Sequence, residues 1–154
     1  MAKQPPNDTA SPITLTHVTV YGSRIEGQLR FAPDAPRTSS PRLIEQLVRT
    51  FPHIGDHACV NECGDRFADV MEHTSLAHVL EHMVIDLQVQ AARRTSQNSQ
   101  HEAAFVGTTE WIDKNAGLAC VRVSFKDDLV ALAAFRQAIE LLNNLVQVVE
   151  QEHV

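Results

Sequence analysis

The chain has 154 residues, the length of one ordinary domain, and this is enough to bury a sizeable core. Its hydrophobic content of 44% is typical of a globular protein and argues against global disorder. The formal net charge is −6, and the basic residues form no stripe, which argues against a dedicated nucleic-acid binder. No apolar run approaches the length of about 18 residues that a membrane span needs.

The first twelve residues are polar and contain prolines, so we expect a flexible arm at 1–12 and a single α+β domain at 13–150. The arm lacks the apolar stretch of a signal peptide, which favours a cytoplasmic protein. An odd number of cysteines argues against a disulfide framework in that reducing compartment. The three are Cys59, Cys63 and Cys120.

The first half of the chain predicts two strands and a helix. Residues 14–21 alternate and are rich in β-branched side chains, and 28–31 continue the alternation. A proline-containing loop is expected at 32–41. Ser40 followed by Pro41 is typical of a helix start, and this helix is expected to end near residue 52.

The second half begins with a segment without periodicity at 53–65, which we interpret as a structured loop, followed by a helical turn at 67–71. Thr74 or Ser75 then begins a long helix that should reach about residue 93. Strands are predicted at 103–107 and 118–125, with a turn at 113–117.

A last helix is expected from Asp127 or Asp128 to about residue 149. The resulting order is β-β-α-α-β-β-α. It predicts an α+β fold with helices packed on one face of a mainly antiparallel sheet.

The chemistry concentrates in the run His78-Val79-Leu80-Glu81-His82. Residues four apart on a helix lie on one face, so the two imidazoles can bind one zinc ion. Glu81 could then take a proton from a metal-bound water and act as the catalytic base. This H-x-x-E-H spacing is the inverzincin pattern. The alternative interpretation is a solvated polar face with two ordinary histidines.

Two family resemblances follow from this helix. The stretch 75–83, Ser-Leu-Ala-His-Val-Leu-Glu-His-Met, resembles the metal helix of pitrilysin and insulinase peptidases. The later run Phe105-Val106-Gly107-Thr108-Thr109, followed by residues 120–125, keeps the strand-then-helix order of such a domain. This resemblance implies an inverzincin-like half-domain with a zinc cofactor.

The second resemblance covers residues 42–145 and is to the amino-terminal domain of cyanophycin synthetases. It is carried by pieces that occur in the same order in both. They are Phe51-Pro52, His57-Ala58-Cys59, Phe67, His73-Thr74 and residues 78–88. It implies hydrolysis of a peptide-like polymer, because this kind of domain is thought to trim cyanophycin, a poly-aspartate with arginine side groups, into primers.

The chain departs from that family pattern at positions outside the H-x-x-E-H helix. Asp65-Arg66 replaces a double glycine, and His73-Thr74-Ser75 replaces Gly-Thr-Trp. The segment 107–110, Gly-Thr-Thr-Glu, lacks both arginines of the family's Gly-Arg-Thr-Arg. These changes affect the substrate more than the metal.

The third metal ligand is predicted to be His57, which lies before the metal helix and matches the family's His-x-Cys. Cys59 could be a soft ligand, although a small buried cysteine is the simpler interpretation. Asp86, one turn beyond His82, could ligate but is better placed to orient that histidine. Glu150 and Glu152 are the C-terminal candidates for the glutamate ligand of pitrilysin-type enzymes.

Three functions compete for this sequence. The first is a zinc metallopeptidase or amidohydrolase that acts on peptide or isopeptide bonds, and Glu81 favours it. The second is a catalytically silent module that binds a peptide or polyamide, and the third is a structural or regulatory zinc domain. We expect no nucleic-acid or membrane partner. Residues 103–109 are predicted to form a sheet edge that binds substrate, or that pairs two copies in a homodimer.

Overall fold

The computed structural model describes residues 10–95 and 104–152. The strands are β1 (Ile13–Tyr21), β2 (Arg24–Phe31), β3 (Ala58–Asn61), β4 (Gly64–Arg66), β5 (Gly107–Asp113) and β6 (Leu118–Ser124). The helices are α1 (Pro41–Thr50), α2 (Leu76–Thr95) and α3 (Asp128–Gln151). Three 3-10 turns complete the order, η1 (Ile54–Asp56), η2 (Phe67–Asp69) and η3 (Met71–His73).

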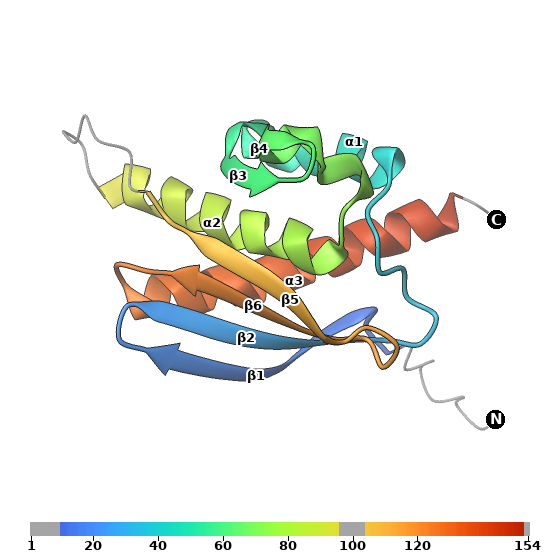
Figure 1. Cartoon of the computed structure of the whole chain (residues 1–154), viewed down its shortest axis with the longest axis horizontal. Coiled ribbons are helices and arrows are strands. Elements are labelled where there is room, and N and C mark those ends of the chain that lie inside the picture. The colour runs from blue at the N-terminus through green and yellow to red at the C-terminus, as the bar shows by residue number, and fades with distance from the viewer. Residues whose placement is uncertain (1–9, 96–103, 153–154) are drawn as a thin grey trace, which may run out of the picture.

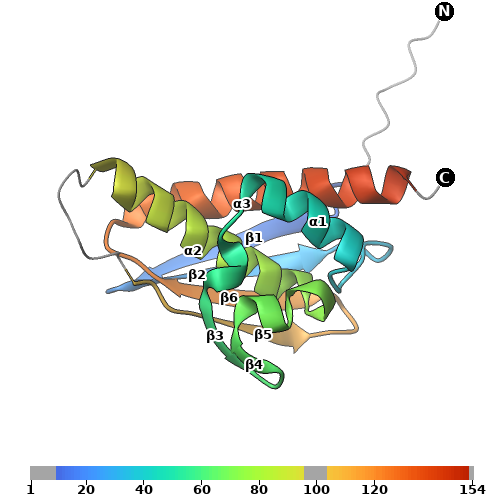
Figure 2. The ribbon, with the colours of Figure 1, turned by 90° about the horizontal axis from the view of Figure 1, so that it is seen from above.

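Four strands form one antiparallel sheet in the order β1-β2-β6-β5 (Figure 1). The helices α2 and α3 cover one face of this sheet, and the hairpin β3–β4 and α1 lie on the far side of the helices (Figures 1 and 2). The predicted α+β class, with an antiparallel sheet and helices on one face, is confirmed.

Helix α2 therefore lies between the sheet and the β3–β4 hairpin, and it is buried on nearly all sides. Every residue from Leu76 to Gln88 is buried except His78, which is half-buried. A helix that is enclosed in this way must place any polar side chain in the interior. The alternative of a solvated polar face is wrong for Glu81, His82 and Asp86.

Two local predictions need correction. The strand expected at 103–107 begins at Gly107 instead and runs to Asp113, whereas 104–106 have no regular structure and residue 103 lies outside the described residues. The predicted loop 53–65 contains strand β3 and most of the hairpin β3–β4. Strand β3 has only four residues and strand β5 carries mostly polar side chains, so neither gave a clear alternating pattern.

Helix α3 is the one described helix that is long and apolar enough to cross a membrane by length and composition alone. Its inner face is packed in this fold, because Phe135, Ala138 and Leu142 are fully buried in the hydrophobic core. A helix packed in a protein core can be as long and as apolar as a helix that spans a membrane.

Asn143 joins α3 to the beginning of β1. Its Oδ1 accepts a hydrogen bond from the Ile13 N–H, and its Nδ2 donates to the Ile13 C=O, both at 2.9 Å. One side-chain amide thus pairs both backbone groups of Ile13, which is 1% exposed.

Asn143→Ala should lower the free energy of unfolding by about 1–3 kcal/mol, because it leaves two buried backbone groups unpaired. Urea denaturation monitored by circular dichroism measures the loss. The exposed neighbour Asn144 provides the matched control, and Asn144→Ala should stay within about 0.5 kcal/mol of wild type. Equal losses in the two variants would contradict the role of the Asn143 amide.

Candidate metal centre

Three side chains from two elements converge beside α2. His78 and His82 are one helical turn apart, with ring centroids 5.0 Å apart. Cys59 comes from β3, and its Sγ lies 3.4 Å from His78 Nε2. One ligand atom from each of the three residues lies within 4.8 Å of the other two. This group could hold a metal ion.

The separation of the atoms fits a tetrahedral zinc site. Zinc binds sulfur at about 2.3 Å and imidazole nitrogen at about 2.0–2.1 Å, so two such ligands are about 3.5 Å apart. The distance from Cys59 Sγ to His78 Nε2 is 3.4 Å. In addition, His82 Nε2 is buried without any hydrogen-bond partner, and a buried nitrogen that is left unpaired costs free energy unless an ion or molecule binds it.

A chain of hydrogen bonds joins Asp86, His57 and His82, and one arrangement of its hydrogens leaves His82 Nε2 free. Asp86 Oδ2 accepts from His57 Nε2 at 3.1 Å. With the His57 ring neutral, its Nδ1 accepts from the Nδ1–H of His82, also at 3.1 Å. In this arrangement the hydrogen of His82 is on Nδ1, which leaves the lone pair on Nε2 free for a metal.

His78 is oriented in a similar way. Thr74 Oγ1 lies 2.9 Å from His78 Nδ1 and can accept its hydrogen. The Nε2 lone pair of His78 then faces Cys59. Both histidines thus present Nε2 toward the group.

Burial keeps both imidazoles neutral. Burial, with a smaller electrostatic effect of the neighbouring His78 and His57 rings, lowers the pKa of His82 to about 2. Burial also lowers the pKa of His78. Burial by itself raises the pKa of Asp86, but hydrogen bonds from His57 and Gln90 outweigh this and hold the pKa below its usual value. Neutral imidazole is the form that binds zinc.

Glu81 is 4% exposed and lies directly beside this group. Its Oε2 is 3.4 Å from His82 Nε2, and its Oε1 accepts a hydrogen bond from Thr109 Oγ1 at 2.8 Å. Burial raises the pKa of Glu81 to about 7, and the hydrogen bond from Thr109 and the nearby His57 oppose this shift. A Cβ on Gly107 would lie 2.7 Å from Glu81 Cγ, so only glycine leaves room for this carboxylate.

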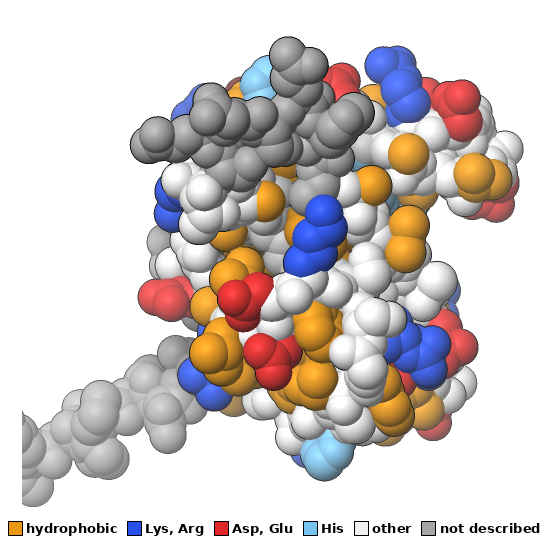
Figure 3. All heavy atoms as spheres, turned by 90° about the vertical axis from the view of Figure 1, so that its left-hand side faces the viewer, with side chains coloured by type: hydrophobic (Ala, Val, Ile, Leu, Met, Phe, Trp, Pro, Cys, Tyr) orange, Lys and Arg blue, Asp and Glu red, His pale blue; other side chains and the backbone are white. Residues whose placement is uncertain are grey.

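The group lies in an open groove with a volume of about 700 Å³. Residues 58–60 of β3 line one side, α2 lines the back, and residues 104–111 line the other side. The β3–β4 hairpin projects beyond β5 in Figure 2, and a notch lies on the right of Figure 3 beneath an overhanging lobe. The candidate metal ligands are therefore accessible from this groove.

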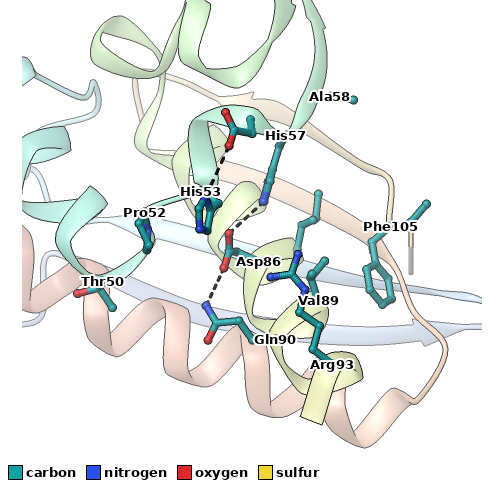
Figure 4. A pocket seen from close by; sticks show the side chains of 13 residues that line it. Thr50, Pro52, His53, His57, Ala58, Asp86, Val89, Gln90, Arg93 and Phe105 are labelled. Atoms are coloured by element: carbon teal, nitrogen blue, oxygen red, sulfur yellow. Dashed lines mark hydrogen bonds and ion pairs between the residues drawn. The ribbon is translucent and has the colours of Figure 1, made fainter. Parts of the chain in front are cut away.

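A second hollow of about 790 Å³ adjoins the groove (Figure 4). The two share the lining residues Ala58, Ile85, Ala104 and Phe105. His57 and Asp86 line the second hollow, and Gln90 Nε2 donates to Asp86 Oδ1 at 2.7 Å. The hydrogen bonds that support His82 thus come from the side of this second hollow.

The structure groups His78 and His82 with Cys59, not with His57, which the sequence favoured as third ligand. His57 instead contacts the other ring nitrogen of His82. Asp86 contacts His57 and not His82 directly, so its predicted orienting role would act through His57.

The remaining candidate ligands lie elsewhere. Glu152 binds Arg42 on the exposed surface, and Glu150 is exposed. The sequence placed Gly107 and Thr109 in the substrate edge but did not predict their contacts with Glu81, nor the stacking of the Phe67 ring on His82 at a centroid distance of 4.0 Å. The glycine in the predicted edge segment was the available signal for the contacts with Glu81.

A comparison with known families matches residues 28–147 to the cyanophycin synthase-like N-terminal domain. The chain belongs to this family. That part of the sequence resemblance is confirmed, whereas the likeness to pitrilysin-type peptidases remains a likeness of sequence. The comparisons with curated proteins and with solved structures each gave no match. In this cyanophycin synthase-like domain, the candidate metal group lies within the matched region.

Replacing any of the three grouped residues should abolish stoichiometric zinc binding. We expect Cys59→Ser, His78→Ala and His82→Ala to lose the ion, because each removes one of the ligand atoms. Metal analysis after dialysis measures the occupancy. Cys63→Ser is the matched control, since Cys63 is exposed, and it should bind zinc like wild type.

The same measurement separates Cys59 from His57 as the third ligand. His57→Ala should still bind one zinc ion at saturation, with an affinity about 10–100-fold weaker, because it removes only a supporting hydrogen bond. If His57→Ala loses zinc while Cys59→Ser keeps it, His57 is the ligand and the grouping described above is wrong.

The raised pKa of Glu81 makes the stability of the metal-free protein depend on pH. The folded chain holds this proton more tightly than the unfolded chain between about pH 4.5 and pH 7. The stability that Glu81 contributes is therefore fully present below pH 4.5 and is lost as the pH rises to about 7.

Glu81→Gln removes this titration. The free energy of unfolding of the variant minus that of wild type should therefore increase by on the order of 3 kcal/mol between pH 4.5 and pH 7. Urea unfolding at pH 4.5 and pH 8 with a chelator measures the change. The exposed Glu110→Gln serves as control and should follow wild type. A difference between Glu81→Gln and wild type that does not vary with pH would contradict the shift.

Proposed function

We propose that this chain is a zinc-dependent hydrolase of peptide or isopeptide bonds, with Glu81 as its catalytic base. One observation carries the proposal. The Glu81 carboxylate lies 3.4 Å from the unpartnered His82 Nε2, beside the Cys59, His78 and His82 group and at the bottom of an open groove. A structural zinc site has no need of a buried carboxylate at this position.

Cys59, His78 and His82 would hold the zinc ion. When bound there, zinc would polarise the amide carbonyl and lower the pKa of water as a Lewis acid. Three protein ligands leave a fourth position open, which distinguishes a catalytic site from a closed structural one.

The role proposed for Glu81 is proton transfer. Its ionised carboxylate takes a proton from the attacking water as the oxygen bonds to the amide carbon. The same proton then passes to the leaving nitrogen as the carbon–nitrogen bond breaks. Burial raises the pKa of Glu81 to about 7 in the metal-free chain, which moves it toward the range in which a carboxylate can both accept and release a proton at neutral pH. The Thr109 hydroxyl holds one oxygen and leaves the other beside His82.

The edge of β5 offers a place for an extended substrate. In the part of the chain that the structure describes, β5 pairs with β6 on one side and with no strand on the other. The Val106 C=O accepts from the Ser124 N–H. Since alternate residues of a strand face opposite edges, Gly107 and Thr109 direct their backbone groups away from β6. A peptide could pair with these groups next to Glu81.

Glu81→Gln should keep bound zinc and lose hydrolysis by about 10²–10⁴-fold, because the amide cannot accept the proton from water. The test incubates the zinc-loaded full chain with a peptide library and with cyanophycin, and mass spectrometry follows the new termini. Wild-type activity should disappear with a chelator and return with zinc.

The control is Glu110→Gln, which removes another carboxylate of the groove that is already bound to Arg122. It should cleave like wild type. Substrate binding without any zinc-dependent cleavage by wild type would instead identify a binding module. Equal rates for Glu81→Gln and wild type would show that Glu81 is not the base.

A further inference from the structure

The side chains that line the groove are nearly all uncharged. None of the described lining residues is lysine or arginine, and only two are carboxylates. Of these, Glu81 lies beside the candidate metal group, and Glu110 accepts a hydrogen bond from Arg122 at 2.9 Å. Apart from Cys59, His78 and His82 of the candidate metal group, the other lining side chains are small, hydroxyl-bearing, apolar or aromatic.

Two solvent-exposed valines line opposite walls of the groove. Val60 of β3 is 96% exposed, and Val106 just before β5 is 72% exposed. Both line the groove together with the partly buried Phe105 and Trp111. Apolar side chains that contact an occupant on either wall would gain free energy by leaving water.

A charged occupant would gain nothing comparable. Each carboxylate or guanidinium side group that packed along the walls would lose hydration, and away from Glu81 and the candidate metal group the described lining offers no free opposite charge. If Glu81 were paired with a guanidinium, it could no longer take the proton that the reaction requires. The lining therefore disfavours a polymer whose side groups alternate in charge.

We infer that the groove selects an extended peptide with small or apolar uncharged side chains over a polyamide that carries carboxylate and guanidinium side groups. This inference rests on the proposed function and names its substrate class. Backbone groups of Gly107 and Thr109 would hold the chain, and the side chains of the occupant would pack against Val60 and Val106.

Binding to the zinc-loaded Glu81→Gln protein tests the selection without turnover. The chain has a single tryptophan, Trp111, which lines the groove, so its fluorescence reports the occupant. The probes are two blocked octapeptides without aromatic residues, one of alanine, valine and serine and one of alternating aspartate and arginine. The uncharged peptide should bind at least about tenfold more tightly.

Val60→Asp and Val106→Asp in the same background should each weaken binding of the uncharged peptide by roughly tenfold. Ile112→Asp is the matched control, because Ile112 is 54% exposed on β5 but does not line the groove, and it should leave binding unchanged. Circular dichroism confirms that each variant folds.

Equal or tighter binding of the charged peptide, or unchanged binding in both valine variants, would overturn the inference. Cleavage by the wild-type protein, measured in parallel, tests the proposed hydrolysis separately. A preference for the uncharged peptide without cleavage would support the selection and count against the hydrolysis.

Discussion

The enclosure of α2 is the constraint on which the site depends. The sheet lies on one side of this helix and the β3–β4 hairpin on the other, so Glu81, His82 and Asp86 are buried although they are polar. A buried polar group costs free energy unless it has a partner. His57 and Thr109, which come from opposite sides of α2, supply such partners. What remains unpaired is His82 Nε2, and its position beside Glu81 is where the chemistry is expected.

Much of this could be predicted from the sequence because it depends on helical spacing. Residues four apart on a helix share a face whatever surrounds them, so His78 and His82 were correctly expected to lie together. The third member could not be predicted in this way. His57 and Cys59 are two residues apart in an irregular segment, and the choice between them depends on the short strand β3 and its hairpin.

The first residue of β5, which borders the groove, was predicted wrongly for a related reason. A strand is recognised from alternation of apolar and polar side chains, but the half-buried positions of β5 hold glycine, threonine and tryptophan and its exposed positions include an isoleucine, so it has no clear apolar face. The apolar run before it suggested a strand that starts too early. The true start at Gly107 matters for the site, because this glycine is the residue against which Glu81 packs.

Different elements supply the candidate ligands and the groove walls, so the proposed substrate could change while the proposed chemistry is kept. Glu81, His78 and His82 lie on one buried helix, where each substitution would disturb the core around it. The walls come from β3 and from the segment 104–111, where Val60 and Val106 are largely exposed. Substitutions there alter the charge and shape of the groove at little cost in stability. The segment 107–110, Gly-Thr-Thr-Glu, which lacks both arginines of the family's Gly-Arg-Thr-Arg, is a change of this kind, and it leaves Glu81 and its hydrogen bond to Thr109 in place.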